Sequence, residues 1–132
     1  MSVRLDHIGI AVKDLDAALG VFRDLFGLSF KGIEEVPEQR VKVAFLPVGD
    51  TKLELLAATG PQGPVAKFIE RRGEGVHHIA LHVEDLEKTM AQLKEQGIRF
   101  IDEEPRQGAG GARIAFVHPK STYGVLVELC ER

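Results

Sequence analysis

An internal repeat constrains the fold of this chain more than any other feature of its sequence. Residues 6–15 read DHIGIAVKDL and residues 77–86 read HHIALHVEDL, so His, Ile, Val, Asp and Leu recur at a shift of 71 residues. The correspondence continues at a shift of 68 for residues 34–37, of 71 for residues 43–46 and of 74 for residues 53–55. Two copies of one structural module are therefore predicted, with short insertions in the loops.

Each copy predicts the element order βαβββ. An apolar strand at 4–12 leads to Asp14, a favourable helix N-cap, and the apolar spacing of a helix then continues to Phe26, before Gly27. The next strands of the first copy are expected at 28–36, 41–48 and 51–57. The second copy predicts a strand at 76–83, a helix at 86–96 and strands near 98–103, 112–118 and 124–130. We expect one domain over residues 1–132, with module 1 at about 1–58, a partly helical connector at 59–74 and module 2 at about 75–132, because either half alone would bury too little apolar surface.

Composition excludes several function classes. The formal net charge of −3 gives no basic excess to neutralise phosphates, so nucleic acid is not an expected partner. The sequence has no apolar run near the ~18 residues that span a bilayer, so no membrane association is expected. Cys130 is the only cysteine, which excludes an intrachain disulfide and a cysteine-based zinc site and fits a reducing cytoplasm.

Four side chains have types and positions that suit a metal site. Strand alternation puts His7 on a face with small residues, and His78 occupies the equivalent position of the second copy. Glu54 and Glu128 lie inside apolar strand sequence, where a carboxylate either points to water or is buried with a partner. A lone histidine in a strand is commonly structural, so each residue taken singly keeps a structural interpretation.

The repeat matches both pairs, His7 with His78 and Glu54 with Glu128, and this favours a pseudo-symmetric site. Two imidazoles and two carboxylates suit a divalent transition-metal ion with one or two positions open to water or substrate. His77 competes with His78, but the repeat aligns it with Asp6. Two other histidines are less defined: His82 either lines the same cavity or fills it, and His118 has no equivalent in the first copy.

The sequence resembles the vicinal oxygen chelate superfamily, in which paired βαβββ modules form a cupped mixed sheet around a metal. The resemblance rests on His7 in DHIGIAV, His78 in GVHHIAL and Glu128 in GVLVEL. Within the superfamily the chain most resembles the methylmalonyl-CoA epimerase family, through residues 36–39, residues 108–116 and the 118–120 segment that leads to the last strand. This resemblance covers essentially the whole chain and implies an α+β fold.

The resemblance also implies a cofactor, a substrate and partners. It implies one divalent metal ion per chain, Co²⁺ ahead of Mn²⁺, Ni²⁺ and Zn²⁺, an acyl-CoA substrate and a homodimer. The anionic CoA needs local positive charge, and Arg113 and Lys120 are the main candidates by type and position. Close backbone approach at Gly110 and Gly111 would admit substrate, and a mobile turn at residues 108–111 is the alternative interpretation. Further basic candidates are Lys67, Arg71 and Arg72. Solvated surface charge is the simpler interpretation of all five basic residues.

Two alternative functions stay open. Glyoxalase I uses the same His/Glu/His/Glu arrangement, although its last strand usually follows an Asp-Pro-Asp-Gly type of turn where this chain has His118-Pro119-Lys120-Ser121. A non-enzymatic small-molecule-binding relative would not need all four ligand positions.

Some epimerases carry a proton-transferring glutamate after the Pro-Glu-Gln segment, but residues 40–44 here contain no carboxylate. The sequence hypothesis is therefore that Glu128 is one base and Glu54 the second. Glu38 and His82 are the alternatives for the second base.

Overall fold

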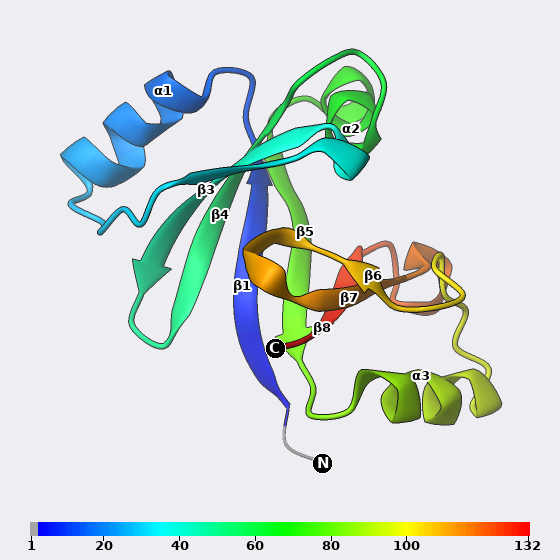
Figure 1. Cartoon of the computed structure of the whole chain (residues 1–132). Coiled ribbons are helices and arrows are strands. Elements are labelled where there is room, and N and C mark those ends of the chain that lie inside the picture. Colours follow the sequence, from blue (N-terminus) through cyan, green and yellow to red (C-terminus); the bar gives the residue numbers. More distant parts are fainter. Residues whose placement is uncertain (1–2) are drawn as a thin grey trace. The chain divides into compact units, whose positions relative to one another are not determined.

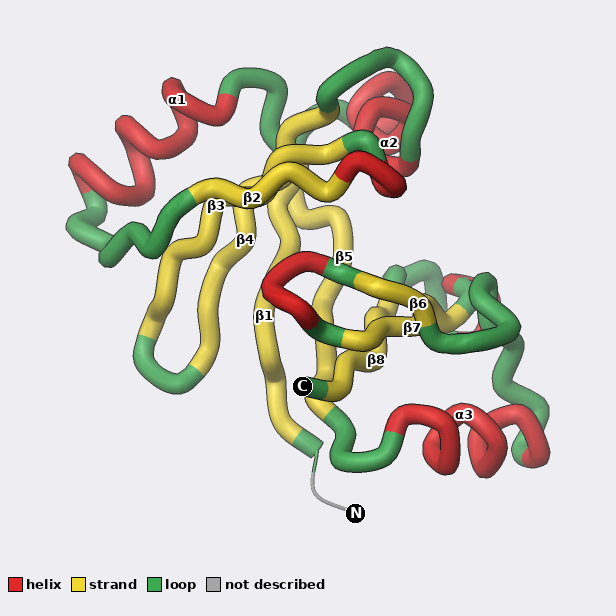
Figure 2. Tube along the Cα trace, viewed as in Figure 1, coloured by secondary structure: helices red, strands yellow, loops and turns green. Residues whose placement is uncertain are grey.

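The computed structural model describes residues 3–132. Residues 7–77 form one compact unit, here called the first unit, and residues 78–132 with the segment that ends at Asp6 form the second unit. Figures 1 and 2 trace the strands and helices of each unit. Among the described residues, no helix has the length and apolar composition that a membrane crossing requires.

The first unit carries a mixed four-stranded arrangement in the order β2-β3-β4-β1, with β1 parallel to β4 and the other neighbours antiparallel. Its strands are β1 (Arg4–Ala11), β2 (Ile33–Val36), β3 (Val41–Val48) and β4 (Thr51–Ala58), and its helices are α1 (Leu15–Leu19) and α2 (Pro64–Arg72). The Asp14 side chain accepts a hydrogen bond from the Ala17 N–H and so caps α1. Leu19, Leu46 and Leu55 are fully or nearly fully buried in the core under α1.

The second unit repeats this connectivity in the order β6-β7-β8-β5, with β5 parallel to β8. Its elements are β5 (Gly75–His82), α3 (Leu86–Glu95), β6 (Arg106–Gln107), β7 (Arg113–Val117) and β8 (Val127–Glu131). Asp85 caps α3 as Asp14 caps α1. Leu86 and Met90 pack from α3 onto Leu129 and its neighbours in β7 and β8.

The predicted α+β class and the βαβββ order are therefore confirmed, and the bounds of three strands are corrected. The helix of the first module continues from Leu19 as a π-helix over Gly20–Leu25, and β2 begins at Ile33 rather than at 28. The segment predicted as a strand at 98–103 makes only an isolated bridge between Phe100 and Val117, and β6 forms at Arg106–Gln107. Its Ile98 N–H bonds back to the end of α3 instead of to a strand. The last strand begins at 127 rather than at 124.

Candidate functional site

The first unit pairs His7 with Glu54 in its interior. Both side chains are buried, and His7 Nδ1 lies 3.4 Å from Glu54 Oε2. The parallel register places Gly9 opposite Glu54, so the small residue two positions after His7 leaves room for the carboxylate. Lys52 Nζ lies 3.8 Å from the same oxygen.

The second unit pairs His78 with Glu128 in the same way. His78 Nε2 lies 3.4 Å from Glu128 Oε1, and both residues are buried. Ala80 lies opposite Glu128, as Gly9 lies opposite Glu54 in the first unit. Each unit therefore contains one His–carboxylate pair, and the register between the histidine strand and the glutamate strand is the same in both units.

Both pairs have the spacing of metal ligands. Two atoms that are each about 2.1 Å from one ion are separated by about 3.0 Å at adjacent octahedral positions and by about 3.4 Å at tetrahedral ones. The separation of 3.4 Å in each pair fits this and exceeds the usual N–H···O range of about 2.7–3.2 Å. His7, His78 and Glu128 are buried candidate metal ligands, and Glu54 has the same chemistry and burial.

A phenylalanine with a cation over its ring accompanies each carboxylate. Phe45 lies opposite Glu54 and Phe116 lies opposite Glu128, at equivalent positions of the repeat. Lys52 Nζ is 5.8 Å from the centroid of Phe45, and Arg106 Cζ is 5.6 Å from that of Phe116. Each carboxylate therefore has a phenyl ring opposite it, and each ring has a cation within about 6 Å of its centroid.

Arg106 and Glu34 are the residues of interest that sequence reasoning missed. Arg106 pairs with Ile114 across β6 and β7, which puts it on the sheet face of Phe116 and Glu128. Glu34 pairs with Val43 across β2 and β3 and shares the face of Glu54 in the first unit. The signal for both is the strand register. For Arg106 it was hidden because the strand before β7 was expected at 98–103.

The candidate substrate residues lie in different surroundings. Arg113 is on the other face of β7, where its terminal nitrogens are 3.0 Å from Glu87 of α3 and 3.2 Å from Glu131. Lys120 lies in a short 3₁₀ turn, is exposed, and donates its backbone N–H to His118 Nδ1. In α2, three basic side chains are exposed: Lys67, Arg71 and Arg72.

The glycine segment 108–111 is held by packing at one end and by a cation in its middle. Gly108 is buried against Ile114, and Gly110 and Gly111 have φ values of 69° and 76°, which favour glycine. The Gly110 carbonyl accepts a hydrogen bond from Arg132 at 3.3 Å. Arg132 also binds the buried Asp6 with two nitrogens, so this cation links the glycine segment to Asp6.

The remaining histidines have separate environments. The His77 ring lies 5.0 Å from the Phe68 ring, edge to face, and burial lowers the pKa of His77 to about 4. His82 is half-buried and pairs with Cys130 across β5 and β8. His118 accepts the hydrogen bond from Lys120 and so caps a turn. Glu38 is exposed in the 3₁₀ turn Pro37–Gln39.

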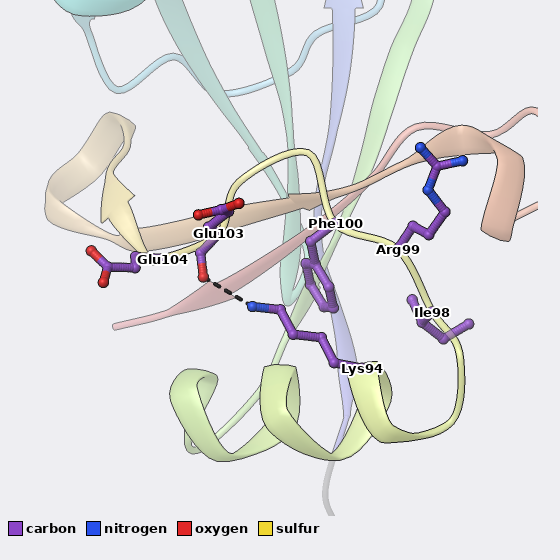
Figure 3. A pocket seen from close by; sticks show the side chains of 6 residues that line it. All are labelled: Lys94, Ile98, Arg99, Phe100, Glu103 and Glu104. Atoms are coloured by element: carbon purple, nitrogen blue, oxygen red, sulfur yellow. Dashed lines mark hydrogen bonds between the residues drawn. The ribbon is translucent and has the colours of Figure 1, made fainter.

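An open pocket of about 460 Å³ lies beside α3 in the second unit (Figure 3). Lys94 lines this pocket and donates a hydrogen bond to the Glu103 carbonyl at 3.0 Å. Ile98 and Phe100 form its apolar side and also pack on the α3 core. It contains none of the candidate ligands and is a separate surface feature.

The chain is similar to proteins of one family over nearly its whole length. A family model described as Glyoxalase/Bleomycin resistance protein/Dioxygenase superfamily matches residues 6–116. The uncharacterized protein YqjC of Bacillus subtilis (strain 168) is 47% identical over 128 residues, covering 97% of this chain and 91% of the relative. The ethylmalonyl-CoA/methylmalonyl-CoA epimerase of Cereibacter sphaeroides is 41% identical over 128 residues, covering 96% of each. A solved methylmalonyl-CoA epimerase in complex with methylmalonyl-CoA and NH4+ matches with a TM-score of 0.93 at 39% identity, covering 99% of this chain and 95% of that chain.

Proposed function

We propose, from the premise that this chain belongs to the Glyoxalase/Bleomycin resistance protein/Dioxygenase superfamily, that it catalyses the epimerisation of methylmalonyl-CoA. The observation that carries the proposal is the 41% identity to an ethylmalonyl-CoA/methylmalonyl-CoA epimerase along both chains. The two buried His–Glu pairs support it, because the reaction needs both charge stabilisation and proton transfer.

The four residues His7, Glu54, His78 and Glu128 are proposed to hold one divalent metal ion, with Co²⁺ expected ahead of Mn²⁺, Ni²⁺ and Zn²⁺. Their burial supports this, because two carboxylates removed from water are costly unless a cation offsets their charge. Imidazole and carboxylate together suit borderline divalent ions. When bound, the ion would stabilise the negative charge that develops on the substrate oxygens as the proton leaves.

Proton transfer is assigned to Glu128 and Glu54. A carboxylate oxygen of one residue takes the proton from the methyl-bearing carbon, and the carbon's electron pair delocalises into the thioester carbonyl. A ligand carboxylate exchanges a proton through its free oxygen or by detaching transiently. The other residue, in its protonated form, returns a proton to the opposite face, so one proton is removed from the substrate and one is returned. Phe45 lies opposite Glu54 and Phe116 lies opposite Glu128, so each carboxyl group has a phenyl ring as its cross-strand neighbour.

The decisive experiment is isotope exchange in heavy water. Methylmalonyl-CoA incubated with the protein is expected to gain deuterium at the methyl-bearing carbon, as read by mass spectrometry or NMR. A separate incubation with the hemithioacetal of methylglyoxal and glutathione tests the glyoxalase alternative. Turnover of the hemithioacetal alone would identify a glyoxalase, and tight binding with no reaction in either assay would identify a sequestering protein.

A second experiment separates the ligand role of Glu54 from its role as a base. In Glu54→Gln the amide oxygen still offers a metal ligand, but the side chain accepts no proton at neutral pH. We expect this variant to keep stoichiometric metal and to lose most epimerisation. If it retains the metal and the parent rate, Glu54 is a ligand only, and Glu38 or His82 becomes the next residue to test.

We also propose that the protein acts in the cytoplasm as a homodimer. Leu25 and Phe26 are 78% and 69% exposed at the end of the first helical segment, and the exposed Val21 and Ile33 lie in the same unit. Leu25 and Phe26 are consecutive in the chain, and large exposed apolar side chains next to each other are typical of protein contact surfaces. Sedimentation velocity at micromolar concentration tests this, and a species of monomer mass would contradict it.

A further inference from the structure

We propose that Arg106 binds an anionic oxygen group of the acyl-CoA substrate and that Asp102 holds the guanidinium in position for this contact. The inference rests on the proposed function, because it names a substrate contact of the same site. All the observations that carry it lie within the second unit.

Strand register puts Arg106 on the face that carries the candidate ligands of this unit. Residues directly opposite each other in neighbouring strands project to the same side of a sheet. Arg106 lies opposite Ile114, two positions before Phe116 on β7, and Phe116 lies opposite Glu128. Arg106, Phe116 and Glu128 therefore share one face.

Two ring contacts connect Arg106 with the metal ligand His78. The guanidinium carbon is 5.6 Å from the Phe116 centroid, and the Phe116 and His78 centroids are 5.6 Å apart in an edge-to-face arrangement. A single phenyl ring therefore separates the cation from a candidate metal ligand.

Asp102 fixes the guanidinium by one edge and leaves the other edge open. Its Oδ1 is 3.0 Å from Arg106 Nε, and its Oδ2 accepts the Phe116 backbone N–H at 2.8 Å. The carboxylate is thereby tied to the edge of β7 and only 15% exposed, unlike a mobile surface partner. Within residues 3–132, no hydrogen bond uses the Nη1 or Nη2 atom of Arg106, and its side chain is 39% exposed.

An anion is the ligand that these features fit. A guanidinium is always charged, and its two terminal nitrogens match the paired oxygens of a carboxylate or phosphate. The chain has a net charge of −3, so an anionic substrate must meet locally placed positive charge. Methylmalonyl-CoA offers a carboxylate on the acyl group and phosphates on CoA.

The test compares Arg106→Met with Arg99→Met, an exposed arginine of the same unit. Arg106→Met is expected to raise KM for methylmalonyl-CoA about 10- to 100-fold, with kcat changed by less than about threefold. Arg106→Lys is expected to recover part of this loss, because lysine restores the positive charge without the two paired terminal nitrogens of arginine. Asp102→Asn is expected to raise KM less than Arg106→Met. Circular dichroism and thermal unfolding check that each variant is folded.

Binding of two partial substrates by calorimetry identifies the anion. Methylmalonyl-pantetheine keeps the carboxylate and lacks the CoA phosphates, whereas propionyl-CoA keeps the phosphates and lacks the carboxylate. Weakening of only one of them by Arg106→Met supports the proposal and identifies the group. Equal weakening of both ligands would place the contact on the thioester arm that they share. Parent affinity for both would show that Arg106 contacts neither anionic group. Either result overturns the proposal. Failure of the proposed function is seen separately, as a parent protein that exchanges no deuterium.

Discussion

Substitution of Gly108 by alanine tests the packing of the ligand-bearing face in the second unit. The backbone of Gly108 has φ −117°, which any residue adopts, so an added methyl group causes no backbone strain. Its Cβ would lie 2.7 Å from Ile114 Cγ2 and 3.0 Å from Ile114 Cδ1. Ile114 is 3% exposed and packs with Phe116 and Cys130, and its β-branched side chain has few rotamers in which to move away. Overpacking of this kind costs about 1–3 kcal/mol.

Urea and thermal unfolding of the metal-free protein measure this cost. For a chain of this size the loss corresponds to a fall of roughly 3–12 °C in the unfolding midpoint. Two matched substitutions separate the possible causes. Gly20→Ala, at φ −58° with nothing within 4 Å, is expected to be neutral or stabilising by about 0.4–1 kcal/mol. Gly111→Ala, at φ +76° with nothing within 4 Å, is expected to cost about 1–2 kcal/mol from backbone strain alone.

A double-mutant cycle connects the cost to Ile114. Ile114→Ala removes the three atoms nearest to the new methyl group, so it is expected to recover about 1–3 kcal/mol of the Gly108→Ala penalty. Ile114→Val keeps Cγ2, the nearest atom, and is expected to recover little. An unchanged midpoint for Gly108→Ala, or the same penalty in the Ile114→Ala background, would refute the contact as the reason for glycine.

Three further predictions concern the metal, the pH dependence of stability and the thiol. His78→Ala is expected to abolish stoichiometric metal binding in elemental analysis, while His77→Ala retains it, and the reverse result would show that the repeat was misaligned. Because burial lowers the pKa of His77 to about 4, the unfolded chain binds a proton that the folded chain excludes. Protonation therefore favours the unfolded chain below about pH 6.5, and the resulting loss of stability grows to at most about 3 kcal/mol as pH falls toward 4. His77→Gln should make the urea midpoint depend less on pH over this range, and an unchanged pH dependence would contradict this. Cys130 is fully buried and burial raises the pKa of its thiol to about 12, so iodoacetamide at pH 8 should label it only in urea, and rapid native labelling would contradict this.

Much of the strand framework could be predicted because its residues alternate or are apolar on both faces. The predicted bounds of β1, β3, β4 and β5 differ from those observed by at most one residue at either end. The segment before β7 could not be predicted, since Ile98, Phe100 and Ile101 imitate a strand. In the structure Ile98 and Phe100 pack on the α3 core instead, and Ile101 is 52% exposed.

The candidate ligands could be selected from the sequence because the repeat relates their positions. His7 is equivalent to His78 in the repeat, Glu54 is equivalent to Glu128, and all four side chains are buried. Arg106 could not be selected in this way, because its sheet face depends on the register between β6 and β7, which no local pattern encodes. The same limit applied to Arg113, which was chosen by type and lies on the face of α3.

The two modules have the same strand order but carry opposite charges at one equivalent position of their edge strands, β2 and β6. Val43 and Ile114 are equivalent in the repeat, and their cross-strand partners are Glu34 and Arg106. The strand pairing therefore relates Glu34 to Arg106, whereas the sequence alignment at a shift of 68 had matched it with Asp102. The equivalent positions therefore carry opposite charges, and Glu34 shares the sheet face of Glu54 within the first unit. If Glu54→Gln keeps its activity, Glu34 therefore becomes a candidate for the second base alongside Glu38 and His82.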